Sequence, residues 1–324
     1  MRIAITGSIA TDHLMTFPGR FVDQFIPEKM DRVSLSFLVD SLEIRRGGVA
    51  ANIAFGLGVL GLSPLLIGAV GRDFEPYRSW LTEHGVDCSG VRESVVRHTA
   101  RFVCTTDADG NQIASFYPGA MSEDADIALA PLVDQAGGVD LVLIGASDPG
   151  AMLSHTQECK DLGIPFAADL SQQLPRLAEA DVCALVDGAA YLFCNEYEEA
   201  LIERKSGWTA SQILDRVGVR VTTLGPAGAK IERASEQPVL VDPVPEIRKV
   251  DPTGTGDAFR SGFLSALAWG LSLERAAQLG NMLAVHVLET VGTQEYELKP
   301  GPLAERLGAV YGPAAAADVS ARYS

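Results

Sequence analysis

Short apolar runs recur along this chain, separated by longer segments whose apolar residues repeat with helical spacing. The short runs predict strands at residues 2–6, 65–70, 141–144, 166–168, 191–193 and 220–224. The longer segments predict helices at 49–60, 75–84, 151–162, 174–186, 196–205, 257–269 and 273–288. Strands that alternate with helices favour a three-layer α/β/α fold, in which helices cover both faces of a mostly parallel sheet.

Two segments break this alternation. Within 12–46, the stretch 33–37 alternates polar and apolar residues as a half-exposed strand does. Within 98–118, the runs 99–106 and 112–117 flank the turn Asp109-Gly110, which predicts a β-hairpin. We expect 12–46 and 98–118 to form a small β-sheet lid domain on an α/β nucleotide-binding core domain made of 1–11, 47–97 and 119–324.

Composition narrows the class of partner. The formal net charge is −16 and no basic stripe is visible, so we expect no nucleic-acid partner. The five cysteines are scattered without a CxxC pair, which argues against a disulfide framework and a structural zinc site. No signal-peptide pattern opens the chain, and no run reaches the roughly 18 apolar residues of a membrane span. We therefore expect a cytoplasmic protein with no membrane partner.

The most informative motif is DPTGTGDAF at 251–259. A glycine-rich turn that leads into a helix collects free backbone N–H groups and the positive end of the helix dipole, which suits an anion. The carboxylate of Asp257 would repel a bound phosphate, so we interpret it as a general base acting on a neutral hydroxyl. Together these features predict phosphoryl transfer to an alcohol, with Gly254, Thr255 and Gly256 as the anion site.

Two motifs near the N-terminus are candidates for binding hydroxyl groups. Ser8 and Asp12 follow the first predicted strand, where ligands bind in open α/β sheets. Asp12 suits vicinal hydroxyls, although a turn or helix-cap role fits the spacing as well. Gly48 opens a helix that carries Asn52, whose partner on an apolar face is either a polyol or a buried backbone group.

Three further motifs each have a structural alternative. Asn195 and Glu198 lie one helical turn apart and suit water-bound Mg²⁺, but also a helix N-cap. Phe102 and Phe116, on the two arms of the hairpin, suit a stacked planar base or ordinary cross-strand packing. The GxGxxG match at 56–61 ends a predicted helix instead of opening one, so we interpret Gly61 as a helix stop and not as part of a dinucleotide site.

Four motifs in this order resemble those of the ribokinase-type (PfkB-type) sugar and nucleoside kinase family across nearly the whole chain. They are Gly47-Gly48 with Asn52, the Asn-x-x-Glu of 195–198, the Thr-x-Gly-x-x-Gly of 223–228 and the DPTGTGD of 251–257. The resemblance implies ATP as co-substrate, bound near Asn195, Thr223, Gly225, Gly228 and Gly256. It also implies Mg²⁺ held through water by Asn195 and Glu198, and K⁺ near the Asp251 loop. Here Thr255 replaces the alanine that is common in the family.

Within the family the chain resembles bacterial adenosine kinases of the actinobacterial type. The similarity lies in 7–15, 33–38, 113–123 and the GTQE of 292–295. It implies that adenosine is the acceptor and that the nucleoside is held by two groups of residues. Ser8, Asp12, Gly48 and Asn52 would hold the ribose, while Phe102 and Phe116 would stack on the base beside Ser36, Gln172 and Gln173.

The reaction so implied is phosphorylation of the adenosine 5′-hydroxyl by ATP, with Asp257 as base. One alternative is a ribokinase or fructokinase, which has no need for a stacking pair of aromatic rings. Another is a non-catalytic nucleoside-binding regulator, against which the intact Asp257 and anion site argue. An exposed apolar face on the lid would let two subunits pair, and we expect a homodimer.

Overall fold

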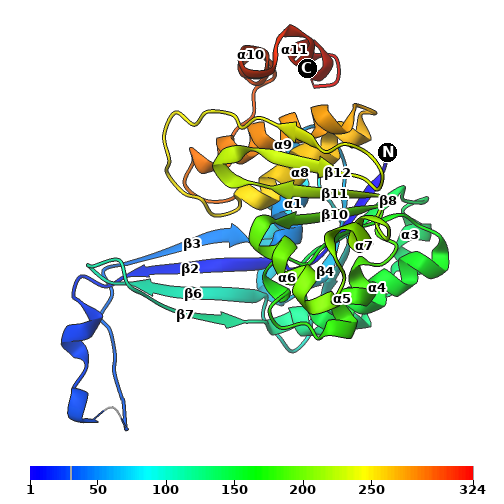
Figure 1. The fold of residues 1–324 in the computed structure, drawn as a ribbon. Helices are drawn as coiled ribbons and strands as arrows, with labels where there is room; N and C mark the ends of the chain where they lie inside the picture. Colours follow the sequence, from blue (N-terminus) through cyan, green and yellow to red (C-terminus); the bar gives the residue numbers. More distant parts are fainter. Residues whose placement is uncertain (30, 324) are drawn as a thin grey trace.

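A computed structural model describes residues 1–29 and 31–323 of the chain. A nine-stranded sheet, ordered β13-β12-β11-β10-β9-β8-β1-β4-β5, forms its centre (Figure 1). All neighbouring strands are parallel except at one edge, where β12 runs antiparallel to both β11 and β13. The strands of this sheet are β1 (Ile3–Thr6), β4 (Leu65–Val70), β5 (Asp87–Glu93), β8 (Leu141–Ile144), β9 (Phe166–Asp169), β10 (Tyr191–Asn195), β11 (Val219–Thr223), β12 (Ala229–Glu232) and β13 (Val239–Val241).

Helices cover both faces of the large sheet, as the alternation predicts. Central strands are apolar on both sides, so successive residues enter opposite cores: Ile3 and Ile5 pack on one face and Ala4 on the other. One face carries α1 (Val49–Val59), α2 (Glu75–Glu83), α8 (Thr255–Ala268), α9 (Leu273–Leu288), α10 (Pro300–Tyr311) and α11 (Pro313–Ser320). The other carries α3 (Leu129–Gln135), α4 (Pro149–Leu162), α5 (Glu179–Val186), α6 (Glu196–Ser206) and α7 (Ala210–Leu214).

A second, four-stranded sheet projects from one end of this core (Figure 1). Its order is β3-β2-β6-β7, with β2 and β6 parallel and the outer pairs antiparallel. The strands are β2 (Ala10–Thr16), β3 (Ser41–Gly47), β6 (Ala100–Thr106) and β7 (Gln112–Tyr117). The hairpin expected at 98–118 is therefore β6 and β7, and the structure confirms the fold class of a mostly parallel core sheet with a small second sheet.

Two predicted elements are wrong. Residues 33–37 form no strand, because Phe37 turns inward onto the rings of Phe17 and Phe21 at centroid distances of 5.1 and 4.9 Å. The helix expected from 174 begins instead at Glu179, where the Ala178 N–H donates to Asp181 at the helix start. No helix in the described ranges is long and apolar enough to cross a membrane.

Candidate active site

One cleft of about 1160 Å³ brings together most of the residues that the motifs single out. It lies at the carboxyl ends of the parallel strands, where open α/β sheets bind ligands. Its wall runs from the small sheet, past the start of α8, to the loop after β11. The expected residues that line it are Ser8, Asp12, Gly48, Asn52, Phe102, Phe116, Gln172, Gln173, Asn195, Glu198, Thr223, Gly225, Gly254, Thr255, Gly256 and Asp257.

The start of α8 has the geometry of an anion site. Gly254 precedes the helix with φ +78°, and a Cβ atom there would lie 2.8 Å from Thr293 Cγ2, so only glycine fits. The first-turn N–H groups of Gly256 and Asp257 have no acceptor within the helix and face the cleft with the positive end of the helix dipole. Thr255 Oγ1 donates back to Pro252 O at 3.0 Å, so its side chain does not occupy these donors.

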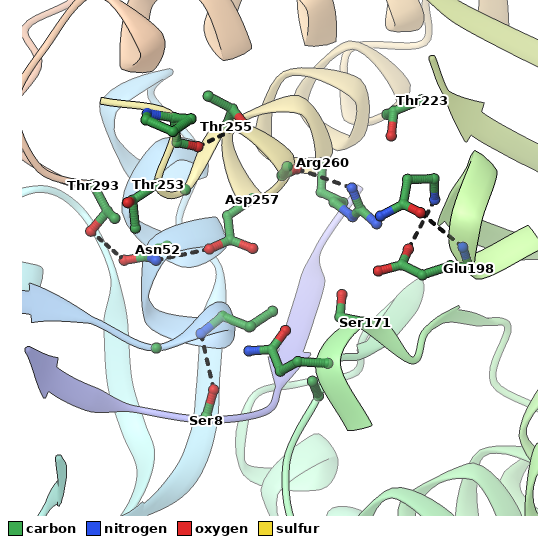
Figure 2. A pocket seen from close by; sticks show the side chains of 18 of the residues that line it. Ser8, Asn52, Ser171, Glu198, Thr223, Thr253, Thr255, Asp257, Arg260 and Thr293 are labelled. Atoms are coloured by element: carbon green, nitrogen blue, oxygen red, sulfur yellow. Dashed lines mark hydrogen bonds between the residues drawn. The ribbon is translucent and has the colours of Figure 1, made fainter. Parts of the chain in front are cut away.

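Asp257 lies in the first turn of α8 and points into the cleft (Figure 2). Its Oδ2 accepts a hydrogen bond of 2.8 Å from Asn52 Nδ2 on α1. Burial raises the pKa of Asp257 to about 7, and the Asn52 hydrogen bond opposes that rise. A carboxylate with such a pKa can take a proton from a hydroxyl near neutral pH, as a general base requires.

A buried ion pair lies next to this turn, and its arginine, Arg260, also lines the cleft. Arg260 Nε and Nη2 donate to the two carboxylate oxygens of Asp169, at 2.8 and 3.0 Å, and both side chains are almost fully buried. Arg260 Nη1 also lies 3.3 Å from Gly256 O. The sequence analysis missed this pair, although an arginine inside the apolar run 259–269 is a signal that a buried partner exists.

The small sheet supplies the opposite wall. Phe102 and Phe116 are direct cross-strand neighbours of β6 and β7, and Asp12 is the neighbour of Phe102 on β2, so all three share the face turned to the cleft. Burial raises the pKa of Asp12 to about 6, with Arg45 opposing the rise. Asp12 therefore lies in a strand and faces the cleft, which excludes the turn alternative.

The polar residues at the start of α1 are held by local hydrogen bonds. Ser8 Oγ accepts from Val49 N at 3.0 Å and caps the helix. Gly48 has φ +95°, and a Cβ there would meet Ser8 O at 2.5 Å, so the chain approaches the backbone of residues 8–10 more closely than any side chain permits. Asn52 is bonded to the carboxylate of Asp257 and not to a buried backbone group.

Asn195 and Glu198 form the helix-capping arrangement that the spacing allowed. Asn195 Oδ1 accepts from Glu198 N at 2.8 Å, and Glu198 Oε2 accepts from Asn195 N at 2.9 Å. Both residues nevertheless line the cleft. Among the described residues, no donor is bonded to the second carboxylate oxygen of Glu198, Oε1. In the part of the chain that the structure describes, no three His, Cys, Asp or Glu side chains are placed to hold a metal directly.

Two expected residues lie outside the main cleft. Gly228 lines a neighbouring cavity of about 310 Å³, which shares Thr223, Gly225 and Gly256 with the cleft. Ser36 is exposed in the strandless segment 33–39 and is absent from both linings. The cleft also contains Arg176 and Thr293, which the sequence analysis did not assign.

Asp251 shows how the anion loop is anchored. Its carboxylate accepts from the N–H groups of Thr253 and Gly292, at 2.9 and 3.2 Å, and from Arg45 Nη1 at 3.4 Å. These donors hold the pKa of Asp251 below its ordinary value against the effect of burial. The guanidinium of Arg45, which comes from β3 of the small sheet, already supplies positive charge at this carboxylate.

The sequence profile of the pfkB family carbohydrate kinases matches residues 8–299. The chain belongs to this family. Membership makes it a phosphotransferase of the class that acts on nucleosides or sugars, with ATP as co-substrate, and agrees with an anion site beside the carboxylate of Asp257.

The relatives of this chain include both nucleoside kinases and a ribokinase. The nucleoside kinase of Methanothermobacter thermautotrophicus is 31% identical over 269 residues, which cover 82% of this chain and 85% of that protein. The ribokinase of Bacillus subtilis is 26% identical over 301 residues, 90% of this chain and 94% of that protein. The structure of Burkholderia thailandensis nucleoside kinase in complex with inosine has a TM-score of 0.84 at 32% identity, covering 96% of this chain and 99% of that one.

Proposed function

We propose that this protein is an adenosine kinase, which transfers the γ-phosphate of ATP to the 5′-hydroxyl of adenosine in purine salvage. The observation that carries the proposal is the cleft in which the aromatic pair Phe102 and Phe116 faces the base Asp257. A purine ring has two flat faces that aromatic side chains can cover, and a free sugar has none. The similarity to nucleoside kinases supports the same choice.

In this proposal the adenosine lies between the small sheet and the start of α8. Asp12, Ser8 and Asn52 hold the ribose, and the glutamine pair Gln172 and Gln173 lies beside the base. The sheet acts as a lid that excludes water, which would otherwise compete with the hydroxyl for the phosphoryl group. Ser36 would reach the nucleoside only if segment 33–39 moves toward the cleft.

Asp257 accepts the proton of the 5′-hydroxyl as the hydroxyl oxygen attacks the γ-phosphorus of ATP. The bond between the γ-phosphorus and the β-phosphate oxygen breaks, and ADP leaves. The N–H groups of Gly256 and Asp257 and the α8 dipole stabilise the negative charge that develops on the phosphoryl oxygens. The triphosphate then extends toward Thr223 and Gly225. The cavity that Gly228 lines, next to the anion site, fits the nucleotide base of ATP.

The residues present fit Mg²⁺ held through water. Glu198 and Asn195 line the cleft, and within the described part of the chain one carboxylate oxygen of Glu198 has no hydrogen-bond donor. A metal that retains most of its water shell needs no more than that. Bound there with ATP, Mg²⁺ would neutralise phosphate charge. K⁺ fits poorly beside the Asp251 carboxylate, because the guanidinium of Arg45 already supplies the positive charge that K⁺ would provide there.

The decisive assay measures ADP release with adenosine, inosine, guanosine, ribose and fructose as acceptors. Adenosine should give the highest kcat/KM. A higher value for ribose or fructose would establish the sugar-kinase alternative instead, and a higher value for inosine would make the enzyme a nucleoside kinase of different base preference. Binding of adenosine without turnover of any acceptor would support a regulator.

We also propose a homodimer formed through the small sheet. Leu42, Ile44 and Ile113 are 56%, 61% and 44% exposed. By strand alternation they lie on the face opposite Asp12 and Phe102. A self-complementary pairing of this face would bury them. Light scattering on the purified protein tests it, with a monomeric mass as the contrary result.

A further inference from the structure

The GTQE sequence at 292–295 has no role in the reaction as described. It nevertheless contacts Asn52, the residue that is hydrogen-bonded to the general base Asp257. Gln294 is fully buried, lies outside the cleft lining, and donates from Nε2 to Asn52 Oδ1 at 2.9 Å. Thr293 Oγ1 lies 2.9 Å from the same oxygen (Figure 2). Asn52 in turn donates to Asp257. The motif therefore lies one residue behind the catalytic carboxylate.

The direction of these hydrogen bonds is fixed by a backbone carbonyl. Tyr77 OH lies 2.9 Å from Gly47 O, and a carbonyl can only accept, so the Tyr77 hydroxyl must donate to it. Because that proton is used, Tyr77 accepts from Gln294, which must present its NH₂ group. The second hydrogen of that group then goes to Asn52 Oδ1.

The Asn52 amide consequently has one permitted orientation. If it were flipped, its NH₂ would face the NH₂ of Gln294 and its oxygen would face the carboxylate of Asp257, and both contacts are repulsive. Holding Gln294 this way has a cost, since its Oε1 is buried with no hydrogen-bond partner among the described residues. An unsatisfied buried oxygen of this kind is expected where the orientation of the side chain is needed to position a functional residue.

We propose that Gln294 and Tyr77 are positioning residues for phosphoryl transfer, which lock the Asn52 amide so that it donates to Asp257. Asp257 Oδ2 is thereby held by Asn52, which leaves the other oxygen for the proton of the acceptor hydroxyl. Neither residue touches the substrate in this scheme. The inference rests on the proposed function only through the role of Asp257 as base.

The lock begins at the connection between the small sheet and the core. Gly47 is the last residue of β3, and Gly48 follows with φ +95° before α1 begins. Thr293 Oγ1 also lies 2.9 Å from Arg46 O, the carbonyl just before. The hydrogen bonds that orient the Asp257 carboxylate thus start at two consecutive carbonyls, Arg46 O and Gly47 O, at the connection between the small sheet and the core.

The test uses Tyr77→Phe and Gln294→Met, which remove the hydroxyl and the amide donors while keeping side-chain size. Tyr323→Phe is the matched control, because its hydroxyl donates to Leu298 O at 2.8 Å far from the cleft. The pH dependence of kcat/KM is measured with whichever acceptor the wild-type enzyme phosphorylates. The other titratable groups that interact with Asp257 stay unchanged in each variant: Asp12, Asp169, Arg260 and Tyr296.

Both variants should shift the acid limb of kcat/KM upward by about one pH unit, since the ionised base loses a hydrogen bond of roughly 1.4 kcal/mol. With a limb near 7, the ionised fraction at pH 7 falls from about one half to about one tenth, so activity drops about fivefold and recovers by about pH 9. The KM for ATP and the Tyr323→Phe profile should not move. An unmoved limb in either folded variant overturns the proposal, even if the rate falls equally at all pH values.

A second measurement does not need turnover. The unfolding free energy of each variant is compared with that of its double mutant carrying Asp257→Asn, across pH. The difference begins near the pKa of the unfolded chain and stops growing at the pKa of Asp257 in the folded protein, so the pH at which it levels off should rise in both variants. No rise overturns the proposal, while absence of turnover in the wild-type enzyme would contradict only the proposed function.

Discussion

Replacing Asp257 by asparagine removes the ionisable group and keeps the size of the side chain. The pKa of Asp257 is raised from 3.8 to about 7, chiefly by burial, so the native state binds more protons than the unfolded chain between these values. The contribution of Asp257 to stability therefore falls as pH rises from about 4 to 7 and stays low above 7. The asparagine side chain of the Asp257→Asn variant never ionises and avoids this loss.

The size of the effect follows from the two pKa values. A tenfold change in proton affinity is worth about 1.4 kcal/mol, so the full difference is roughly 4 kcal/mol at pH 8. The carboxylate borders the cleft, where water screens part of its charge, and we expect a gain of about 1–3 kcal/mol. At pH 4 the variant and the wild-type protein should unfold with similar free energies.

Urea unfolding at pH 4 and pH 8 measures the stability, and ADP release measures turnover. Asp187→Asn, at an exposed position, is the control and should change neither. The Asp257→Asn variant should gain stability only at pH 8 and lose most of kcat. Equal stability at both pH values would refute a desolvated carboxylate, and near-normal turnover would refute the assignment of the base.

Three further predictions address other parts of the site. Phe102→Ala should raise the KM for adenosine by about 5- to 150-fold, because stacking on a base is worth about 1–3 kcal/mol; a similar change with ribose would contradict stacking. Arg260→Met should cost about 3–5 kcal/mol in urea unfolding by leaving Asp169 buried and unpaired, and Asp169→Asn in the same chain should restore part of it. Replacing K⁺ by tetramethylammonium should leave the rate unchanged, whereas Arg45→Met should create a K⁺ requirement; a wild-type requirement would refute the role of Arg45.

The core of the fold was predictable because its strands are buried on both faces. Runs such as β4 (Leu65–Val70) are apolar throughout and match the expected bounds. β2 and β3 were missed, since half of their residues face a cleft or solvent and carry polar side chains such as Asp12 and Arg45. The alternation at 33–37 led to a wrong strand prediction, because Phe37 packs in an aromatic cluster with Phe17 and Phe21 and not in a sheet.

The same limit applies to the site. Residues within one glycine-rich turn, such as Gly254 and Asp257, can be recognised together because they are neighbours in sequence. Asp169 and Arg260 are 91 positions apart and Asn52 and Gln294 are 242 apart, so no local pattern joins them. The sequence does indicate that such partners exist, because a charged or amide side chain in an apolar segment, such as Arg260 or Asn52, needs a hydrogen-bond partner when it is buried.

The general base could therefore be predicted from the sequence, whereas the residues that orient it could not. The chemistry of a turn that holds phosphate is local, because it depends on backbone N–H groups and one adjacent carboxylate. The hydrogen bond that orients that carboxylate does not depend on local sequence. The Asn52 amide could adopt two orientations, which exchange its oxygen and its NH₂ group, and a series of hydrogen bonds that ends at a backbone carbonyl selects one of them. Here that chain runs from Gly47 O through Tyr77 and Gln294 to Asn52, so the polarity of the site is set at the connection to the small sheet and not at the start of α8.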